Sequence, residues 1–244
     1  MPINKLVTTH KAAVEDIPDG SSIFLDGFGG PGGLAIGLIR ALRDQGARNL
    51  TIIGNTAGFG GAAAPPNFQF EDQSILVQNN QIRKAIAAFP VHARASITTA
   101  FHQAFLDGNV ELEMSPQGTL AERIRAGAFG IGAFYTPTGV GTAMAEGKEA
   151  RIIDGREHLL EYGLTADYAI LRAHKADYMG NLVYRGTSRN FNPMMAAAAR
   201  VTIVEVDQIV DIGDLDPEKI VTPGIFVNRL VLRNWELPGP APVQ

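Results

Sequence analysis

Hydrophobic positions along the first half of the chain follow two alternating kinds of pattern. Short apolar runs at 21–26, 49–55 and 82–89, and the alternating run at 110–115, are typical of strands. Helical periodicity marks 9–17, 34–46, 96–108 and 116–127, with Thr9 as an expected N-cap and Gly46 as an expected stop. Because neighbouring parallel strands need a crossover, this order predicts an open, mainly parallel α/β sheet flanked by helices.

The second half of the chain is richer in strands. Runs at 131–136, 167–177, 180–184, 200–210 and 224–231 predict strands, and the two runs around Asp154-Gly155 predict a hairpin over 150–161. Helical signals are limited to 192–199 and a single turn at 216–220. The stretch 57–70 is rich in Gly, Ala and Pro, which predicts a loop. No repeat or linker is visible, so we expect a single domain over 1–244.

Composition narrows the class of protein. Hydrophobic residues make up 45% of the 244 positions, enough for a sizeable core, and the net charge is −4 with scattered Lys and Arg, which disfavours nucleic-acid binding. Cysteine is absent, which excludes disulfides and thiol catalysis. No apolar run approaches the roughly 20 residues of a membrane span, and the first residues lack the apolar region of a secretory signal. We therefore expect a cytoplasmic protein.

A glycine-rich segment follows the first predicted strand. Gly27, Gly29 and Gly32 spell G-x-G-x-x-G, but the second strand ends in Gly54-Asn55, where a dinucleotide site needs an acidic residue. A tight turn needs one or two glycines, whereas 27–33 contains five. The segment therefore indicates close approach of another backbone or of an anionic group, because free N–H groups at a helix start attract phosphate or an oxyanion.

Further clusters of special residues occur at predicted strand ends, at 54–56, 115–142 and 184–193. Loops beyond the carboxyl ends of parallel strands converge on one crevice, so we expect the glycine-rich segment, Asn55 and Gln117 to line one site. The five histidines have no metal-ligand spacing, and no G-x-S-x-G nucleophile motif is present. We expect no metal.

The motifs "DGFGGPGG" at 26–33 and "SPQGTLAERIRAGAFGIGAFYTPTGVGT" at 115–142 resemble those of a known family. Together with "GNLVYRGTSRNFNP" and "VDQIVDIGDLDPEKIVTPGIFV", they resemble the alpha subunit of class I, 3-oxoacid-type CoA-transferases over about Lys11 to Val231. The resemblance implies transfer of CoA from an acyl-CoA donor such as succinyl-CoA to a 3-oxoacid such as 3-oxoadipate or an acetoacetate-like acid.

In such enzymes the thioester is attacked by a glutamate of a separate beta subunit. The resemblance therefore implies no catalytic nucleophile in this chain, a beta-subunit partner in a hetero-oligomer with two copies of each subunit, and no tightly bound cofactor beyond CoA as a substrate. Glu146 and Glu161 are superficial candidates for a nucleophile, and we expect them to serve structure or solvent contact.

The resemblance also assigns site residues. Asn55 and Gln117 are expected to face the acyl group, Gly118 to allow close backbone approach, and Gly139 and Gly141 to shape the opposite wall. The residues expected to contact CoA are Gly27, Phe28, Gly29, Gly30, Pro31, Gly32 and Gly33.

The chain departs from the family pattern at Asp26, Leu34 and Thr56, and it departs most in the stretch 59–73, which leaves the acyl substrate open. Two other functions remain possible from the sequence: hydrolysis of a CoA thioester on the same fold, and ligand binding without catalysis. A helix-turn-helix segment would favour a sensor, and the sequence shows none.

Overall fold

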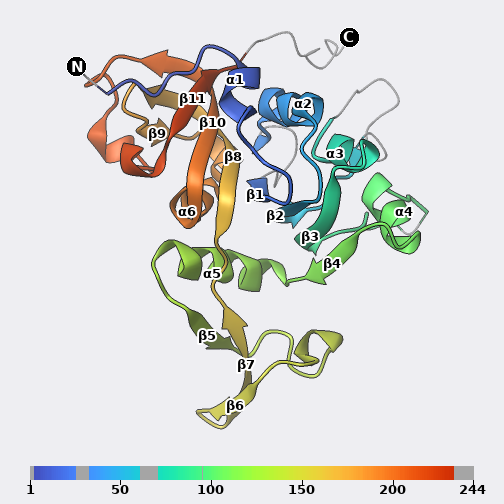
Figure 1. Cartoon of the computed structure of the whole chain (residues 1–244). Helices are drawn as coiled ribbons and strands as arrows, with labels where there is room; N and C mark the ends of the chain where they lie inside the picture. Colours follow the sequence, from blue (N-terminus) through green and yellow to red (C-terminus); the bar gives the residue numbers. More distant parts are fainter. Residues whose placement is uncertain (1–2, 26–32, 61–70, 95, 234–244) are drawn as a thin grey trace, which may run out of the picture.

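The computed structural model describes residues 3–25, 33–60, 71–94 and 96–233. Within these residues, eight strands form a main sheet, in the order β11-β10-β8-β1-β2-β3-β4, with β9 paired to β8 (Figure 1). All neighbours along this order are parallel, and only β9 is antiparallel. The strands are β1 (Ser22–Leu25), β2 (Leu50–Thr56), β3 (Ile82–Phe89), β4 (Glu111–Met114), β8 (Ala166–Asp177), β9 (Leu182–Val183), β10 (Ala199–Val210) and β11 (Arg229–Leu232). The expected mainly parallel α/β sheet is confirmed.

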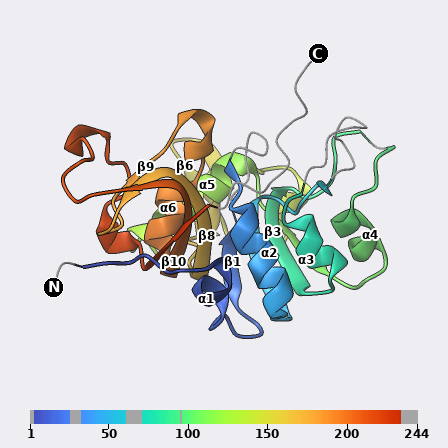
Figure 2. The ribbon, with the colours of Figure 1, turned by 90° about the horizontal axis from the view of Figure 1, so that it is seen from above.

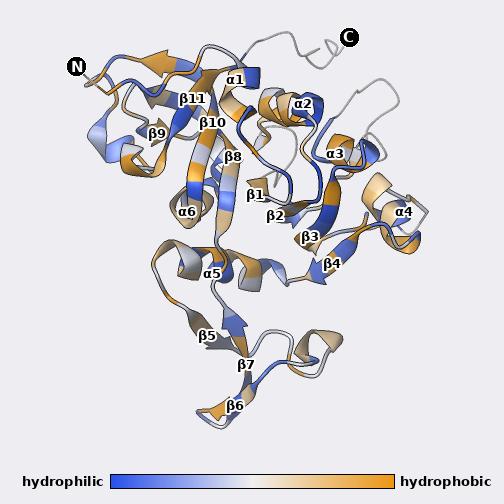
Figure 3. Cartoon of the chain, viewed as in Figure 1, coloured by the Kyte–Doolittle hydropathy of each residue, from blue (hydrophilic) through white to orange (hydrophobic). Residues whose placement is uncertain are grey.

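Helices cover both faces of this sheet. Seen from above, β10, β8, β1 and β3 follow one another across the molecule (Figure 2). One hydrophobic cluster lies beneath α1 (His10–Val14), α2 (Ile36–Gln45), α3 (Ser74–Gln78) and α4 (Ala100–Leu106), and a second lies beneath α5 (Gln117–Ala128) and α6 (Asn192–Ala198). Helix α2 shows both hydrophobic and hydrophilic colours in Figure 3, because it buries one face only.

A second, antiparallel sheet lies beyond α5, at the bottom of Figure 1. It consists of β5 (Ala133–Thr136), β7 (Arg156–Tyr162) and β6 (Ala150–Ile153), in that order. Buried Glu161 of β7 links this small sheet to α5, because its carboxylate pairs with Arg123 at 3.8 Å and with Lys148 at 2.5 Å. The run at 131–136 was expected to be a strand, but the sequence did not predict that it belongs to a separate sheet.

Local sequence signals explain several element ends. The Thr9 hydroxyl accepts a hydrogen bond from the Ala12 N–H at 3.1 Å and caps α1. Helix α2 ends at Gly46 in the left-handed conformation. The hairpin between β6 and β7 turns through Asp154 (φ 49°) and Gly155 (φ 73°), the positive values that a type I′ turn requires.

Two differences from the sequence expectations have clear physical reasons. Helix α3 was not predicted, because five residues are too few to show a helical period. The last strand is shorter than 224–231, since Gly224–Phe226 forms a 3₁₀ turn. The backbone of Gly224 is bound elsewhere: its N–H donates to Asn181 Oδ1 at 2.8 Å, and its carbonyl accepts from Lys5 Nζ at 2.6 Å.

The remaining described 3₁₀ turns are short connectors. They are η3 (Ala143–Ala145), η4 (Gly186–Arg189) and η5 (Pro217–Lys219), and the third of these matches the single turn expected at 216–220.

Candidate active site

The strand order reverses between β1 and β8. Strands β2, β3 and β4 extend from β1 in one direction, and β10 and β11 extend from β8 in the other. In open α/β sheets, ligands bind beyond the carboxyl ends of the strands at such a reversal. The glycine-rich segment leaves β1 at this point. Of it, Gly33 is described and buried, while Gly27–Gly32, like Asp26, lie outside the described residues.

Asn55 lies near the carboxyl end of β2, the strand next to β1. Its side chain is 6% exposed. A Cβ on the preceding residue, Gly54, would lie 2.2 Å from the Leu25 carbonyl oxygen of β1, so only glycine fits there. Gly54 therefore allows the ends of β1 and β2 to approach closely, and it places the Asn55 amide next to this close contact.

Gln117 is the first residue of α5, directly after the β4 end and Pro116. Its Nε2 donates a hydrogen bond to Asn55 Oδ1 at 2.8 Å, although the two residues are 62 positions apart in the chain. The structure thus brings together the two amides that the sequence singled out. Gly118, the next residue, is exposed, and a Cβ built on it meets no atom within 4 Å. The fold itself therefore does not require glycine at 118.

The amide pair has hydrogen-bonding capacity left over. With the amides in this orientation, Gln117 retains a second N–H, and the Asn55 NH₂ group donates to no other described residue. Neutral amide donors stabilise a carbonyl oxygen that gains negative charge, and they add no competing charge of their own. The pair can therefore serve as an oxyanion-binding group.

A second set of polar residues supports the end of β2. Gln73 Nε2 donates to the carbonyl oxygen and to Oγ1 of Thr56, each at 2.9 Å. Buried Asp72 accepts from the backbone N–H groups of Phe59, Gly60 and Ser74, at 2.7 to 3.1 Å. Sequence reasoning missed both roles. The available signal was an Asp two residues before Ser74, the spacing of a side-chain cap.

Charged groups hold the strand that leads into Gln117. Glu113 of β4 pairs with Lys84 of β3 at 2.6 Å and with Arg123 of α5 at 2.9 Å. Partial burial raises the pKa of Glu113, but the hydrogen bonds from Lys84 and Arg123 outweigh it and hold that pKa below its ordinary value. These ion pairs join β3, β4 and the middle of α5.

Neither glutamate considered as a nucleophile hydrogen-bonds to the amide pair. Glu146 is exposed, and both Glu146 and Glu161 line a cavity of about 670 Å³ between β4, α5 and the small sheet, with Arg123 and Lys148. Gly139 packs within the small sheet, since a Cβ there would lie 3.1 Å from Met144 Cβ and 3.5 Å from Leu159 Cδ1. A Cβ built on Gly141, by contrast, would meet no atom within 4 Å.

The described part of the chain contains no cluster of three or more His, Asp or Glu side chains suited to a metal ion. Among the same residues, no helix has the length and apolar character that a membrane crossing needs.

Comparison with known proteins identifies the family. Residues 7–233 match the family described as Coenzyme A transferase. The chain belongs to this family. The family expected from the sequence motifs is thereby confirmed, and coenzyme A thioesters are the substrates of this class of enzyme.

Two curated members of the coenzyme A transferase family show how near the likeness is. The A-type subunit of 3-oxoadipate CoA-transferase from Pseudomonas putida is 50% identical over 231 residues, which cover 94% of each chain. The A-type subunit of a probable succinyl-CoA:3-ketoacid coenzyme A transferase from Bacillus subtilis (strain 168) is 45% identical over 94% of this chain and 90% of its own.

Two solved structures with low sequence identity share the fold. An acyl-CoA transferase of Escherichia coli O157:H7 has a TM-score of 0.80 at 21% identity, and the match covers 100% of this chain but 50% of that one. Glutaconate coenzyme A-transferase of Acidaminococcus fermentans has a TM-score of 0.77 at 20% identity, over 93% of this chain and 75% of that one. At these identities the likeness establishes the fold alone.

Proposed function

We propose that this chain is the alpha-type component of a hetero-oligomeric CoA-transferase that moves CoA from an acyl-CoA donor such as succinyl-CoA to a 3-oxoacid. Support comes from relatives named as the A-type subunits of 3-oxoadipate and of succinyl-CoA:3-ketoacid CoA-transferases, at 50% and 45% identity over 94% of the chain. In this proposal the nucleophilic glutamate belongs to a beta-type partner, and the assembly contains two copies of each chain.

The observation that carries the proposal is the hydrogen-bonded Gln117–Asn55 pair at the carboxyl edge of the sheet. When a carboxylate attacks a thioester, the carbonyl oxygen becomes an oxyanion before the CoA thiolate leaves. The remaining N–H groups of the two amides stabilise that oxyanion. In this proposal the chain supplies these donors and the partner supplies the nucleophile, so each chain contributes half of an active site.

The remaining assignments follow from position. The glycine-rich segment 27–33 contacts the CoA portion of the substrate with backbone N–H groups. Gly118 leaves open space beside Gln117, so that the acyl portion can approach the first turn of α5. Thr56, held by Gln73, stands beside Asn55 and contributes to the choice of acyl group.

The test uses the chain reconstituted with its beta-type partner. Succinyl-CoA is supplied with 3-oxoadipate or with acetoacetate, and both the new acyl-CoA and free thiol are followed. A transferase forms the new acyl-CoA only when an acceptor is present, with little free CoA. Release of free CoA at the same rate without any acceptor would instead establish the hydrolase, and the proposal would be wrong.

A further inference from the structure

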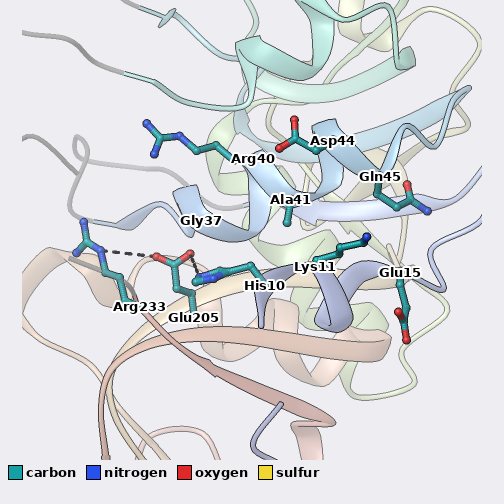
Figure 4. A pocket seen from close by; sticks show the side chains of 10 residues that line it. All are labelled: His10, Lys11, Glu15, Gly37, Arg40, Ala41, Asp44, Gln45, Glu205 and Arg233. Atoms are coloured by element: carbon teal, nitrogen blue, oxygen red, sulfur yellow. Dashed lines mark ion pairs between the residues drawn. The ribbon is translucent and has the colours of Figure 1, made fainter. Parts of the chain in front are cut away.

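Glu205 of β10 is a fully buried carboxylate that no role has yet explained. Its side chain is 0% exposed, and its Oε2 accepts a hydrogen bond from the Leu38 backbone N–H, in the first turn of α2, at 3.1 Å. Figure 4 shows its carboxylate between His10 and Arg233. The partner distances are 3.5 Å from Oε2 to His10 Nε2 and 3.7 Å from Oε1 to Arg233 Nε.

Helix α2 depends on this distant carboxylate for its capping. Its N-cap residue, Ala35, makes no side-chain hydrogen bond, and its first turn contains no acidic residue. Free N–H groups at a helix start need an acceptor, and a negative charge there is favourable. Glu205 supplies both from a position 167 residues away in the chain.

The close approach is built into α2 as well. A Cβ on Gly37 would lie 2.7 Å from Glu205 Oε2 and 2.4 Å from His10 Nε2, both too short for real contacts. A glycine in a helix is less stable than alanine, and here it leaves room for the side chains of both His10 and Glu205 against the first turn of α2. A core carboxylate used only for packing would gain nothing over an apolar residue of the same size.

A ligand site in the adjoining cavity of about 770 Å³ is a weaker explanation. Its lining carries both signs of charge on each side, with Lys11 and Glu15 on the side of α1 and Arg40 and Asp44 on α2, so it favours neither an anion nor a cation (Figure 4). The hydrogen bond between Glu205 and the Leu38 N–H of α2 therefore explains the buried carboxylate better than a ligand does.

We propose that Glu205 is a positioning residue for CoA binding. It fixes the first turn of α2, and with it Gly33 and Leu34, where the glycine-rich segment ends. Leu34 is 2% exposed, so this end is anchored in the core. The inference rests on the proposed function, which assigns the glycine-rich segment to CoA and the Gln117–Asn55 pair to the acyl group.

The experiment compares steady-state kinetics of reconstituted enzymes. Glu205→Met keeps the volume and removes the acceptor. It is expected to raise KM for acyl-CoA about tenfold, with kcat and the acceptor KM within about twofold. Glu205→Gln still accepts from Leu38 N–H, so its KM for acyl-CoA stays within about threefold of wild type. Asp44→Asn, on the exposed far end of α2, is the matched control and leaves all constants unchanged.

Gly37→Ala tests the same contact without removing the carboxylate, and it decides the matter if Glu205→Met fails to fold. Its added methyl group displaces both His10 and Glu205, raises KM for acyl-CoA and makes amide exchange at Leu38 faster. A lower melting temperature with an unchanged KM for acyl-CoA in these variants overturns the inference. That result leaves wild-type transfer intact, whereas absence of transfer by the wild-type enzyme refutes the proposed function itself.

Discussion

The Gln117 side chain uses its hydrogen bonds differently from a core glutamine. Gln81, 0% exposed, donates both N–H groups to backbone carbonyls, those of Leu42 and Ala47, at 3.0 and 2.9 Å. Gln117 donates one to Asn55 and keeps one. A buried amide must satisfy itself within the protein, whereas a site amide can leave a donor for substrate. Gln117 thus keeps a donor available for substrate, which Gln81 does not.

Gln117→Ala is therefore expected to slow transfer with little loss of stability. Losing one donor to a developing oxyanion raises the barrier by about 2.7–4 kcal/mol, a fall of about 10²–10³ in kcat. The measurement is kcat/KM for donor and acceptor beside a thermal melt of the reconstituted enzyme. Gln103→Ala, an exposed glutamine that pairs with Asp107, is the control. A large fall in melting temperature with normal turnover per folded enzyme would assign Gln117 to structure.

At the scale of elements, the sequence predicted those helix ends and turns that depend on a single short segment of the chain. The Thr9 cap, the end of α2 and the Asp154-Gly155 turn were all predictable. Contacts between segments that lie far apart in the chain could not be predicted from the pattern of hydrophobic and polar residues. The sheet to which β5 belongs depends on its pairing with β7, and the roles of Gln73 and Glu205 depend on chain segments that meet only after folding. The Gln117–Asn55 meeting was expected because both follow strands of one parallel sheet.

Helix α5 offers a matched pair of glycines with opposite expected effects. A Cβ on Gly127 would lie 1.9 Å from the Leu164 carbonyl oxygen, so Gly127→Ala should destabilise the chain by about 1–3 kcal/mol. Gly118→Ala meets nothing within 4 Å and should stabilise α5 by about 0.5–1 kcal/mol, while hindering substrate and lowering kcat/KM. Urea unfolding and kinetics on both variants check this. Full activity in Gly118→Ala would remove residue 118 from the site.

The ion pairs joining β3, β4 and α5 predict a pH dependence of stability. The folded pKa of Glu113 is depressed, so its contribution is present above the ordinary pKa of about 4.3 and is lost as pH falls through the folded value. Glu113→Gln should thus cost about 0.5–1 kcal/mol at pH 7, a modest value because the side chain is partly exposed. Unfolding from pH 7 to 3 should show this difference shrink.

Glu111→Gln is the comparison. Glu111 lies on the same strand, but its side chain is exposed and its pair with Arg83 is longer, at 3.8 Å. This substitution should cause almost no pH-dependent loss of stability. If the difference in unfolding free energy between wild type and Glu113→Gln stays constant down to pH 3, the interpretation is contradicted.

On the scale of the whole molecule, the proposed oxyanion donors lie at one sheet edge, and carboxylates elsewhere in the described chain are held by other groups. Glu161, one of the two glutamates considered as a nucleophile, pairs with Lys148, and the buried Glu205 accepts from the first turn of α2. The proposed division of the active site therefore assigns the nucleophile to a second subunit.

The isolated chain is therefore expected to be inert with succinyl-CoA and 3-oxoacids. Titrating a fixed amount of it with the beta-type partner should give activity that rises and saturates at equal numbers of the two chains. Light scattering at saturation measures the composition. Robust turnover by the chain alone would show that the nucleophile is in this chain after all.

The position of β8 beside β1 also has a consequence for synthesis of the protein. The Ser22 backbone N–H of β1 donates to Asp167, 145 residues later. At about 5–20 residues per second, a nascent chain emerging from the ribosome waits about 7–30 seconds before the partner of that edge exists. Until then Ile23 and Leu25 lie on an unpaired strand edge, open to a neighbouring nascent chain. Co-translational solubility of this protein is thus governed by how quickly residues 166–177 follow, and slow codons between β4 and β8 would favour aggregation.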